Sequence, residues 1–256
     1  MQFDEFADDE LSLDGFLGGR LQVLQPVNGY RAAMDPVLLA ATVPARPGQS
    51  VLELGCGVGV ASLCLAARVP GLRLHGLEVQ PPYGALARRN AAASGIDIEI
   101  HIGDLARMPP SLAEKSFDHV ILNPPYFTAD DGTPAMNKGR EAARREVTPF
   151  AVWIATALRR LKPRGWLTVV QASERLPELL VELGTFTGST IVVPVAPRSG
   201  KPAKRILART CKGGRGPFRL HPPLILHEGD RHVRDGDDLT PAASAILRRG
   251  EALRLE

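Results

Sequence analysis

One apolar stretch of the chain ends in groups that suit chemistry on a planar amino group. Residues 123–127 read Asn-Pro-Pro-Tyr-Phe and follow Ile121-Leu122. Proline fixes its own φ and restricts the residue before it, so a strand must stop here in a rigid bend. The Asn123 side-chain oxygen and the Pro124 carbonyl can each accept one N–H of an amino group. This favours a pyramidal nitrogen whose lone pair can attack a methyl group.

The prolines would hold these acceptors in place, and such preorganisation is worth several kcal/mol without a general base. Tyr126 offers a face on which a base can stack, for about 1–3 kcal/mol. A proline-rich turn with a buried tyrosine is the structural alternative. The position after a strand favours chemistry, because α/β sheets bind ligands outside their strand ends. We predict that Asn123, Pro124 and Tyr126 are catalytic and that Phe127 contacts substrate.

A glycine-rich turn comes earlier, in Val51-Leu52-Glu53-Leu54-Gly55-Cys56-Gly57-Val58-Gly59. Glycines at a strand-to-helix turn let a ligand approach the backbone amides. Glu78 ends the next apolar stretch, where an acid can accept from ribose hydroxyls. This pair alone would equally suit a nicotinamide dinucleotide. The spacing is G-x-G-x-G, however, whereas dinucleotide sites have G-x-G-x-x-G.

The elements that must position these groups alternate along the chain. We predict strands at 51–54, 72–77, 96–100, 119–122 and 166–171, with helices at 60–69 and 82–94 between them. This order indicates an α/β fold with a mostly parallel sheet covered on both faces. Residues 190–195 and 205–210 suit an antiparallel hairpin at the sheet edge.

The N-terminal part precedes this alternation. Residues 16–26 predict a hairpin that turns at Gly18-Gly19, and Asp35-Pro36 predicts a helix through Val43 with Asp35 as its N-cap. We therefore divide the chain into an N-terminal extension, 1–44, and a catalytic domain, 45–256, with a basic C-terminal hairpin.

Composition is that of an ordinary soluble protein: 256 residues, 44% hydrophobic and 23% charged. No apolar run could span a bilayer, and the acidic N-terminus is unlike a targeting signal, so we expect no membrane association and a cytoplasmic location. The three cysteines form no CxxC pair, and His221, His227 and His232 are irregularly spaced. We therefore expect no metal.

Basic residues gather near the C-terminus. From Arg198 to Arg219 the chain has eight basic residues and no acid. Such a run can be a solvated surface or a surface that follows phosphates. A second basic group follows the Asn-Pro-Pro-Tyr bend. We predict that these two groups bind RNA, chiefly through Lys138, Arg140, Lys201, Lys204, Arg205 and Lys212.

The order of these motifs resembles the class I S-adenosylmethionine-dependent methyltransferases. The resemblance rests on ELGCGVG, Glu78, Asp104 in Gly103-Asp104-Leu105, and the NPPY motif. It implies a Rossmann-like fold with a seven-stranded sheet and S-adenosylmethionine as cofactor. The residues implied in cofactor binding are Gly55, Gly57 and Gly59 under the methionine part, Glu53 at its end, Glu78 on the ribose, Asp104 on the adenine, and Asn123.

Further residues narrow the resemblance to the bacterial tRNA(Val) adenine-N(6)-methyltransferase family: Gln25, Tyr30, Asp35, NPPYF and the basic C-terminal hairpin. This resemblance implies methylation of an adenine amino group in tRNA near the anticodon. NPPY also occurs in enzymes that methylate rRNA guanine or a protein glutamine, which stay open as alternatives. An RNA-binding protein with a structural cofactor pocket is the alternative outside enzymes.

Overall fold

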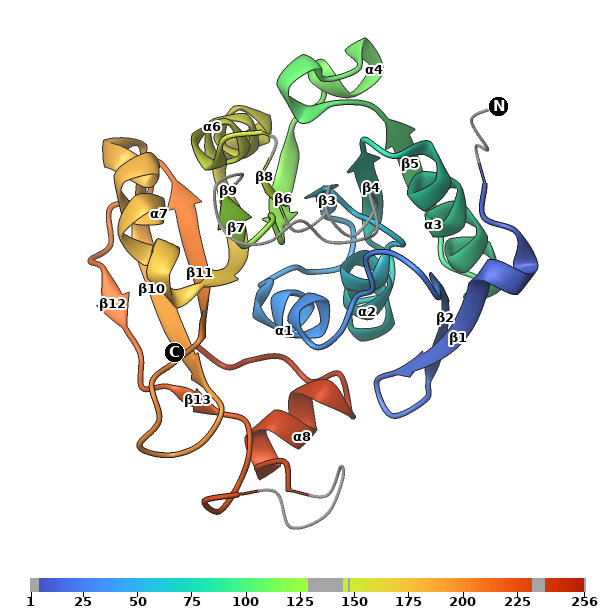
Figure 1. The fold of residues 1–256 in the computed structure, drawn as a ribbon. Coiled ribbons are helices and arrows are strands. Elements are labelled where there is room, and N and C mark those ends of the chain that lie inside the picture. The colour runs from blue at the N-terminus through green and yellow to red at the C-terminus, as the bar shows by residue number, and fades with distance from the viewer. Residues whose placement is uncertain (1–4, 129–144, 147, 232–237, 256) are drawn as a thin grey trace.

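The computed structural model describes residues 5–128, 145–146, 148–231 and 238–255. Its centre is a nine-stranded sheet in the order β12-β10-β11-β9-β6-β3-β4-β5, with β13 also beside β10 (Figure 1). The strands are β3 (Ser50–Leu54), β4 (Arg73–Glu78), β5 (Ile98–Ile102), β6 (Phe117–Leu122), β9 (Leu161–Ala172), β10 (Thr187–Ala196), β11 (Arg205–Lys212), β12 (Arg219–Leu220) and β13 (Leu224–Ile225).

The sheet confirms the predicted Rossmann-like class. Strands β5, β4, β3, β6 and β9 are parallel neighbours, and β11 runs antiparallel to both β9 and β10. Seven of the strands are five residues or longer, and β12 and β13 add two residues each. The chain moves from β3 outward to β5 and then returns to the other side of β3 as β6. This reversal creates a switch point, where such folds bind ligands.

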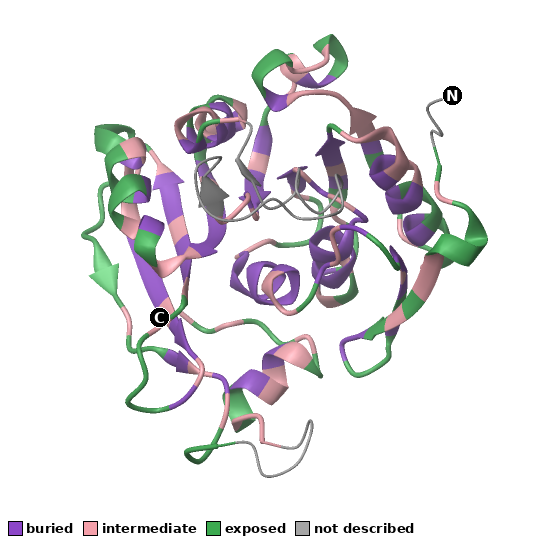
Figure 2. Ribbon diagram, viewed as in Figure 1, coloured by how far each residue is buried: buried purple, intermediate pink, exposed green. Residues whose placement is uncertain are grey.

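Both faces of the sheet are covered, because successive residues of a buried strand point to opposite faces. Val51 belongs to one hydrophobic cluster and Leu52 to the other. The first cluster includes α1 (Asp35–Thr42), α2 (Val60–Arg68), α3 (Pro81–Ala93) and α8 (Pro241–Leu247). The second includes α4 (Pro110–Ala113), α6 (Phe150–Arg160) and α7 (Leu176–Leu183). Purple buried residues accordingly fill the central strands and α1 (Figure 2).

Short elements complete the fold. They are the 3-10 helices η1 (Asp8–Glu10), η2 (Leu105–Arg107), η3 (Ser173–Arg175) and η4 (Gly184–Phe186), and the parallel pair β7 (Phe127–Thr128) and β8 (Arg145–Glu146). Among the residues that the structure describes, no helix is long and apolar enough to cross a membrane.

The predicted N-terminal hairpin is present as β1 (Leu11–Phe16) and β2 (Leu21–Pro26). Asn90 of α3 fastens it to the domain: its Oδ1 accepts from the Leu24 amide at 2.9 Å, and its Nδ2 donates to the carbonyls of Leu24 and Val58. One hydrophobic cluster contains residues from both sides of the boundary predicted at residue 44. The hairpin and α1 therefore pack as part of the main core.

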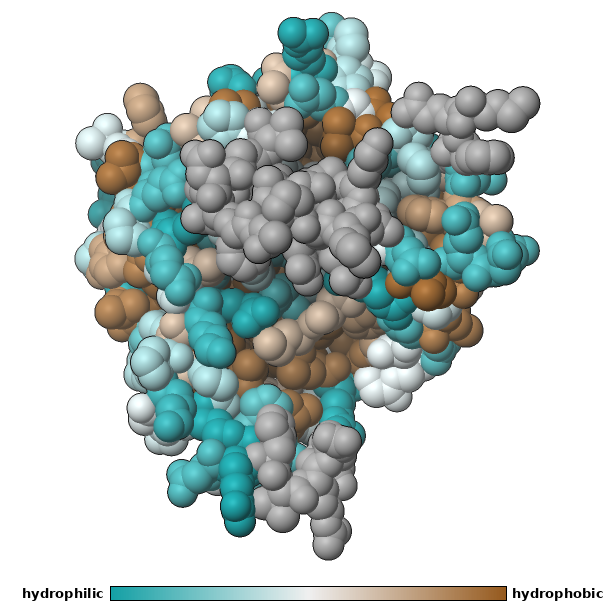
Figure 3. All heavy atoms as spheres, in the orientation of Figure 1, coloured by the Kyte–Doolittle hydropathy of each residue, from teal (hydrophilic) through white to brown (hydrophobic). Residues whose placement is uncertain are grey.

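The predicted N-cap of α1 is wrong. Met34 occupies the cap position, and Asp35 is the first helical residue. The Asp35 carboxylate instead faces two side chains from distant elements, described below. At the other end of the chain, α8 contacts α1. Hydrophobic atoms gather between the two helices in the space-filling view (Figure 3), which explains why a short helix is held there.

Candidate active site

A cavity of about 570 Å³ opens at the switch point, at the carboxyl ends of β3, β4 and β6. Volumes of this order are usual for sites that enclose a small molecule. Of the residues predicted from sequence, the cavity is lined by Gly55, Gly57, Glu78, Asn123, Pro124, Tyr126 and Arg205. The two motifs singled out from sequence therefore share one cavity, although Gly55 and Asn123 are 68 positions apart in the chain.

All three glycines of the turn have a positive φ, and two of them line the cavity. Gly55 has φ +66°, and a Cβ added there would lie 2.7 Å from the Trp153 indole. Gly57 has φ +53° and forms part of the cavity wall. Its amide donates to Glu78 Oε2 at 2.9 Å, so that Glu78 anchors the turn. Gly59 is the N-cap of α2 and does not line the cavity.

Glu78 is buried at the end of β4 and lines the cavity. Its Oε1 accepts from the Gln80 amide at 2.9 Å. Burial raises the pKa of Glu78, while the hydrogen bonds from Gln80 and Gly57 oppose that rise. Each carboxylate oxygen keeps a second lone pair, so Glu78 can still accept from hydroxyl groups of a ligand.

Two other predicted cofactor residues do not line the cavity. Asp104 follows β5 and caps η2, accepting from the Ala106 amide at 2.8 Å. Glu53 is buried in β3, and its Oε2 accepts from the amide and hydroxyl of Ser62 at 3.0 and 2.5 Å. Their contacts with a cofactor remain predictions.

Burial gives Glu53 a pH-dependent effect on stability. Desolvation raises the pKa of Glu53 from 4.5 to about 7, despite the hydrogen bonds from Ser62. A carboxyl with a raised folded-state pKa stabilises the fold fully below its unfolded pKa and loses this contribution as pH rises through the folded pKa. The window therefore lies between about pH 4.5 and 7, and the loss amounts to about 3 kcal/mol.

We expect Glu53→Gln to remove this loss. Urea unfolding of both proteins should show that wild type loses about 2–3 kcal/mol relative to the variant between pH 5 and 7.5. Glutamine keeps an acceptor for Ser62, and the variant carries the other titrating groups unchanged. A difference in unfolding free energy that stays constant with pH would contradict the assignment to Glu53.

Asn123 comes directly after the buried end of β6 and lies at the cavity. Its Nδ2 donates to the Tyr30 hydroxyl at 3.4 Å. This contact orients the amide and leaves the Asn123 Oδ1 atom to accept from a substrate amino group. Burial, and then the charge of Asp35, raises the pKa of Tyr30, so the hydroxyl stays protonated and neutral.

Tyr126 is held by two residues from other parts of the chain. Its hydroxyl donates to Asp35 Oδ2 at 2.8 Å, and Arg205 Nε lies 2.5 Å from Asp35 Oδ1. The Arg205 guanidinium also lies 5.7 Å from the centre of the Tyr126 ring. Arg205 is therefore paired with Asp35 in the cavity wall, and its contact with RNA stays a prediction.

The other residues of the basic run differ in their surroundings. Lys212 donates to the carbonyls of Leu158 and Leu161 at 2.7 and 2.8 Å, at the end of α6, and its contact with RNA stays a prediction. Arg198 is buried and pairs with Asp238 at 2.6 Å. Lys201 and Lys204 are exposed in the turn between β10 and β11, whose predicted antiparallel pairing is confirmed.

Three predicted substrate contacts are not tested by the structure. Lys138 and Arg140 lie outside the described residues. Phe127 has a described backbone in β7, but its side chain falls outside the described part.

The cavity is also lined by residues to which the sequence analysis assigned no part in the site, among them Tyr30, Asp35, Gln80 and Trp153. Tyr30 and Asp35 frame the entry to α1, and their spacing matched a family pattern without indicating a partner. Trp153 lies in α6. Its buried Nε1 has no hydrogen-bond partner among the described residues, which leaves a donor beside the cavity.

Comparisons with known proteins agree with this geometry. The family model of the methyltransferase small domain matches residues 34–189. A protein from Porphyromonas gingivalis named tRNA1(Val) (adenine(37)-N6)-methyltransferase is 32% identical over 76% of this chain and 80% of its own length. A protein of the same name from Actinobacillus succinogenes is 29% identical over 76% of this chain and 82% of its own.

A solved structure from Agrobacterium tumefaciens, described as a predicted O-methyltransferase, superposes with a TM-score of 0.69. It is 27% identical and covers 86% of this chain and 98% of its own.

Proposed function

The chain belongs to the methyltransferase small-domain family, and from this membership we propose that it transfers a methyl group from S-adenosylmethionine to the exocyclic amino group of an adenine in tRNA. The relatives named above carry that activity in their names, at position 37 of a valine tRNA. Of the alternatives raised from sequence, guanine and protein glutamine are not favoured by any of these relatives.

The observation that carries the proposal is the shared cavity. Asn123 and Tyr126 lie in the same wall as Gly55, Gly57 and Glu78. An amino group bound to the Asn123 Oδ1 and the Pro124 carbonyl would therefore lie in the same cavity as a cofactor bound over the glycine turn. Fixed acceptors aimed at a developing charge are worth about 3 kcal/mol or more in enzyme sites.

The described residues fit S-adenosylmethionine, the methyl donor of this class. When bound, the cofactor supplies an activated methyl group on a sulfonium. Glu78 can accept from its ribose hydroxyls, and the glycine turn leaves room for close backbone approach. The Trp153 Nε1–H is a buried donor without a partner among the described residues, as expected beside a polar ligand.

Tyr126 is suited to contact the substrate base. Burial and the neighbouring Asp35 carboxylate raise the pKa of Tyr126, so it stays a neutral phenol whose ring can stack on a base. Asp35 fixes its hydroxyl, and Arg205 stacks near its ring. Because tRNA is handled in the cytoplasm, we expect the protein there.

Incubation of the protein with bulk tRNA and S-adenosylmethionine, followed by mass spectrometry of the nucleosides, tests the proposal. We expect a gain of N6-methyladenosine. Methylated guanosine instead, or no methylated nucleoside together with methylated glutamine in added protein, would contradict it.

RNA affinity should depend on the two exposed lysines beside the cavity. Lys204 directly precedes Arg205 of the cavity wall, and Lys201 lies in the same turn. Each phosphate contact contributes about 0.7–0.9 to the slope of log affinity against log salt. Replacing both lysines with alanine should therefore reduce the slope by about 1.5 and leave S-adenosylmethionine affinity unchanged.

Filter binding of tRNA across a salt series measures this slope. The matched control is Arg46→Ala with Arg73→Ala, two exposed cations at the opposite, amino ends of β3 and β4. The control should keep the wild-type slope. Equal slopes in wild type and the lysine variant would remove both lysines from the RNA surface.

A further inference from the structure

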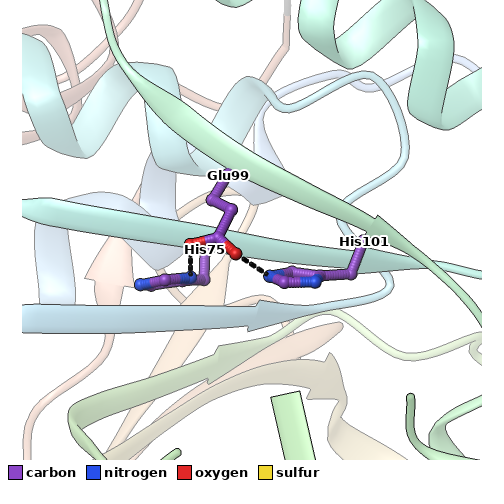
Figure 4. A group of neighbouring side chains, drawn as sticks. All are labelled: His75, Glu99 and His101. Carbon is purple, nitrogen blue, oxygen red and sulfur yellow. Dashed lines mark ion pairs between the residues drawn. The ribbon is translucent and has the colours of Figure 1, made fainter. Parts of the chain in front are cut away.

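Three potential metal ligands converge on β4 and β5, outside the cavity described above (Figure 4). His75 lies opposite Glu99 in the parallel register, and His101 follows two residues later on the same face of β5. The two strands therefore fix all three side chains on one side of the sheet. The ligand atoms of the three residues lie within 4.8 Å of one another.

The two imidazoles are arranged to share a ligand. Their planes differ by 19°, and their ring centres are 5.9 Å apart. Figure 4 shows them nearly in line with the Glu99 carboxylate beside the gap. His75 Nδ1 lies 3.1 Å from Glu99 Oε2, and His101 Nε2 lies 3.2 Å from Glu99 Oε1. Ligand atoms around a tetrahedral zinc ion, each about 2.0–2.2 Å from the metal, are separated by similar distances.

Neither facing nitrogen is satisfied by hydrogen bonding. His75 Nδ1 and His101 Nε2 are buried and have no hydrogen-bond partner among the described residues, although both lie close enough to Glu99 for an ion pair. Buried polar atoms of this kind usually mark a missing partner such as an ion.

Glu99 has one other partner. Lys115 Nζ lies 3.0 Å from both of its oxygens, and the lysine side chain is 40% exposed. The Lys115 ammonium contacts both carboxylate oxygens, as a bound metal ion would. Its exposure allows the lysine to swing into solvent when a stronger cation arrives.

We propose that His75, Glu99 and His101 bind one divalent transition-metal ion of the zinc class, and that Lys115 withdraws when it binds. Two imidazoles and one carboxylate form a set that suits zinc and its neighbours better than magnesium or calcium. Such an ion would bridge β4 and β5. The predicted cofactor residues Glu78 and Asp104 each come three residues after one of these histidines, so the ion would brace the strands that position them.

Calorimetric titration of untagged, chelator-treated protein with zinc chloride tests the site. We expect one zinc per chain and an upward shift of the thermal transition as zinc is added. Glu99→Gln should weaken binding at least about tenfold. Glu99 is half exposed, so this variant should fold, and His75→Ala and His101→Ala should weaken binding further.

Two variants separate this site from adventitious binding. His221→Ala removes a histidine elsewhere on the chain and should leave zinc affinity unchanged. Lys115→Ala removes the competing ammonium and should tighten zinc binding severalfold. Cobalt should give visible absorption bands in wild type that are lost in His101→Ala. Absence of zinc binding in wild type, or equal affinity in wild type and Glu99→Gln, would overturn the proposal.

Discussion

Asn123→Ala should lower kcat by about a hundredfold or more and leave S-adenosylmethionine affinity nearly unchanged. The Asn123 amide is oriented by Tyr30 and follows a strand whose last residues are fully buried, so its oxygen is fixed before substrate binds. An acceptor fixed in this way acts on the amino nitrogen as it attacks the methyl group. The alanine variant keeps the bend, because both prolines remain.

Single-turnover methyl transfer to tRNA measures the effect directly, and calorimetry measures cofactor affinity in parallel. Asn28→Ala, which removes an exposed asparagine outside the cavity lining, is the control and should keep wild-type kcat. Tyr30→Phe should lower kcat less than Asn123→Ala does, since it removes only the hydroxyl that orients the amide. If Asn123→Ala turns over at a rate near that of wild type, this residue has no part in the chemistry.

The central fold could be predicted because the sequence signals were local. Apolar runs separated by helical stretches predicted β3, β4 and β6 within two residues of their observed bounds. Strand β5 begins two residues later than predicted, and β9 begins five residues earlier. The glycine turn and the bend at Asn123 could be placed together because parallel strands bring their carboxyl ends to one edge. Neither inference required knowledge of side-chain contacts.

Contacts between distant residues could not be predicted in this way. Asp35 looked like an N-cap, yet it meets Tyr126 and Arg205, which are 91 and 170 positions further along the chain. Lys212 was predicted to contact RNA, and its hydrogen bonds to carbonyls at the end of α6 were not anticipated. The charge of each residue can be read from the chain, whereas its partner is determined by strand register and helix packing.

The histidines illustrate the same limit. Sequence spacing drew attention to His221, His227 and His232, which lie near one another in the chain. The convergent pair, His75 and His101, is separated by 26 positions and meets only through the pairing of β4 with β5. An expectation about metal based on cysteine and local histidine spacing therefore did not consider this cluster.

Gly55→Ala should destabilise the protein by about 2–5 kcal/mol and greatly weaken S-adenosylmethionine binding. Two costs combine at this position. An alanine with φ +66° is strained by about 1–2 kcal/mol, and its Cβ would lie 2.7 Å from the Trp153 indole, which adds about 1–3 kcal/mol of overpacking. Relief would require Trp153 to move, and Trp153 also lines the cavity.

Gly48→Ala separates these two costs, because Gly48 has φ +83° but no atom within 4 Å of the added Cβ. This control should show the backbone strain alone and bind S-adenosylmethionine like wild type. Urea unfolding and calorimetry of both variants give the comparison. Trp153→Leu in the Gly55→Ala background should recover part of the lost stability, because a smaller side chain removes the contact while the strain remains. If Gly55→Ala costs no more than Gly48→Ala, the close approach of the glycine turn to Trp153 does not explain the need for glycine at this position.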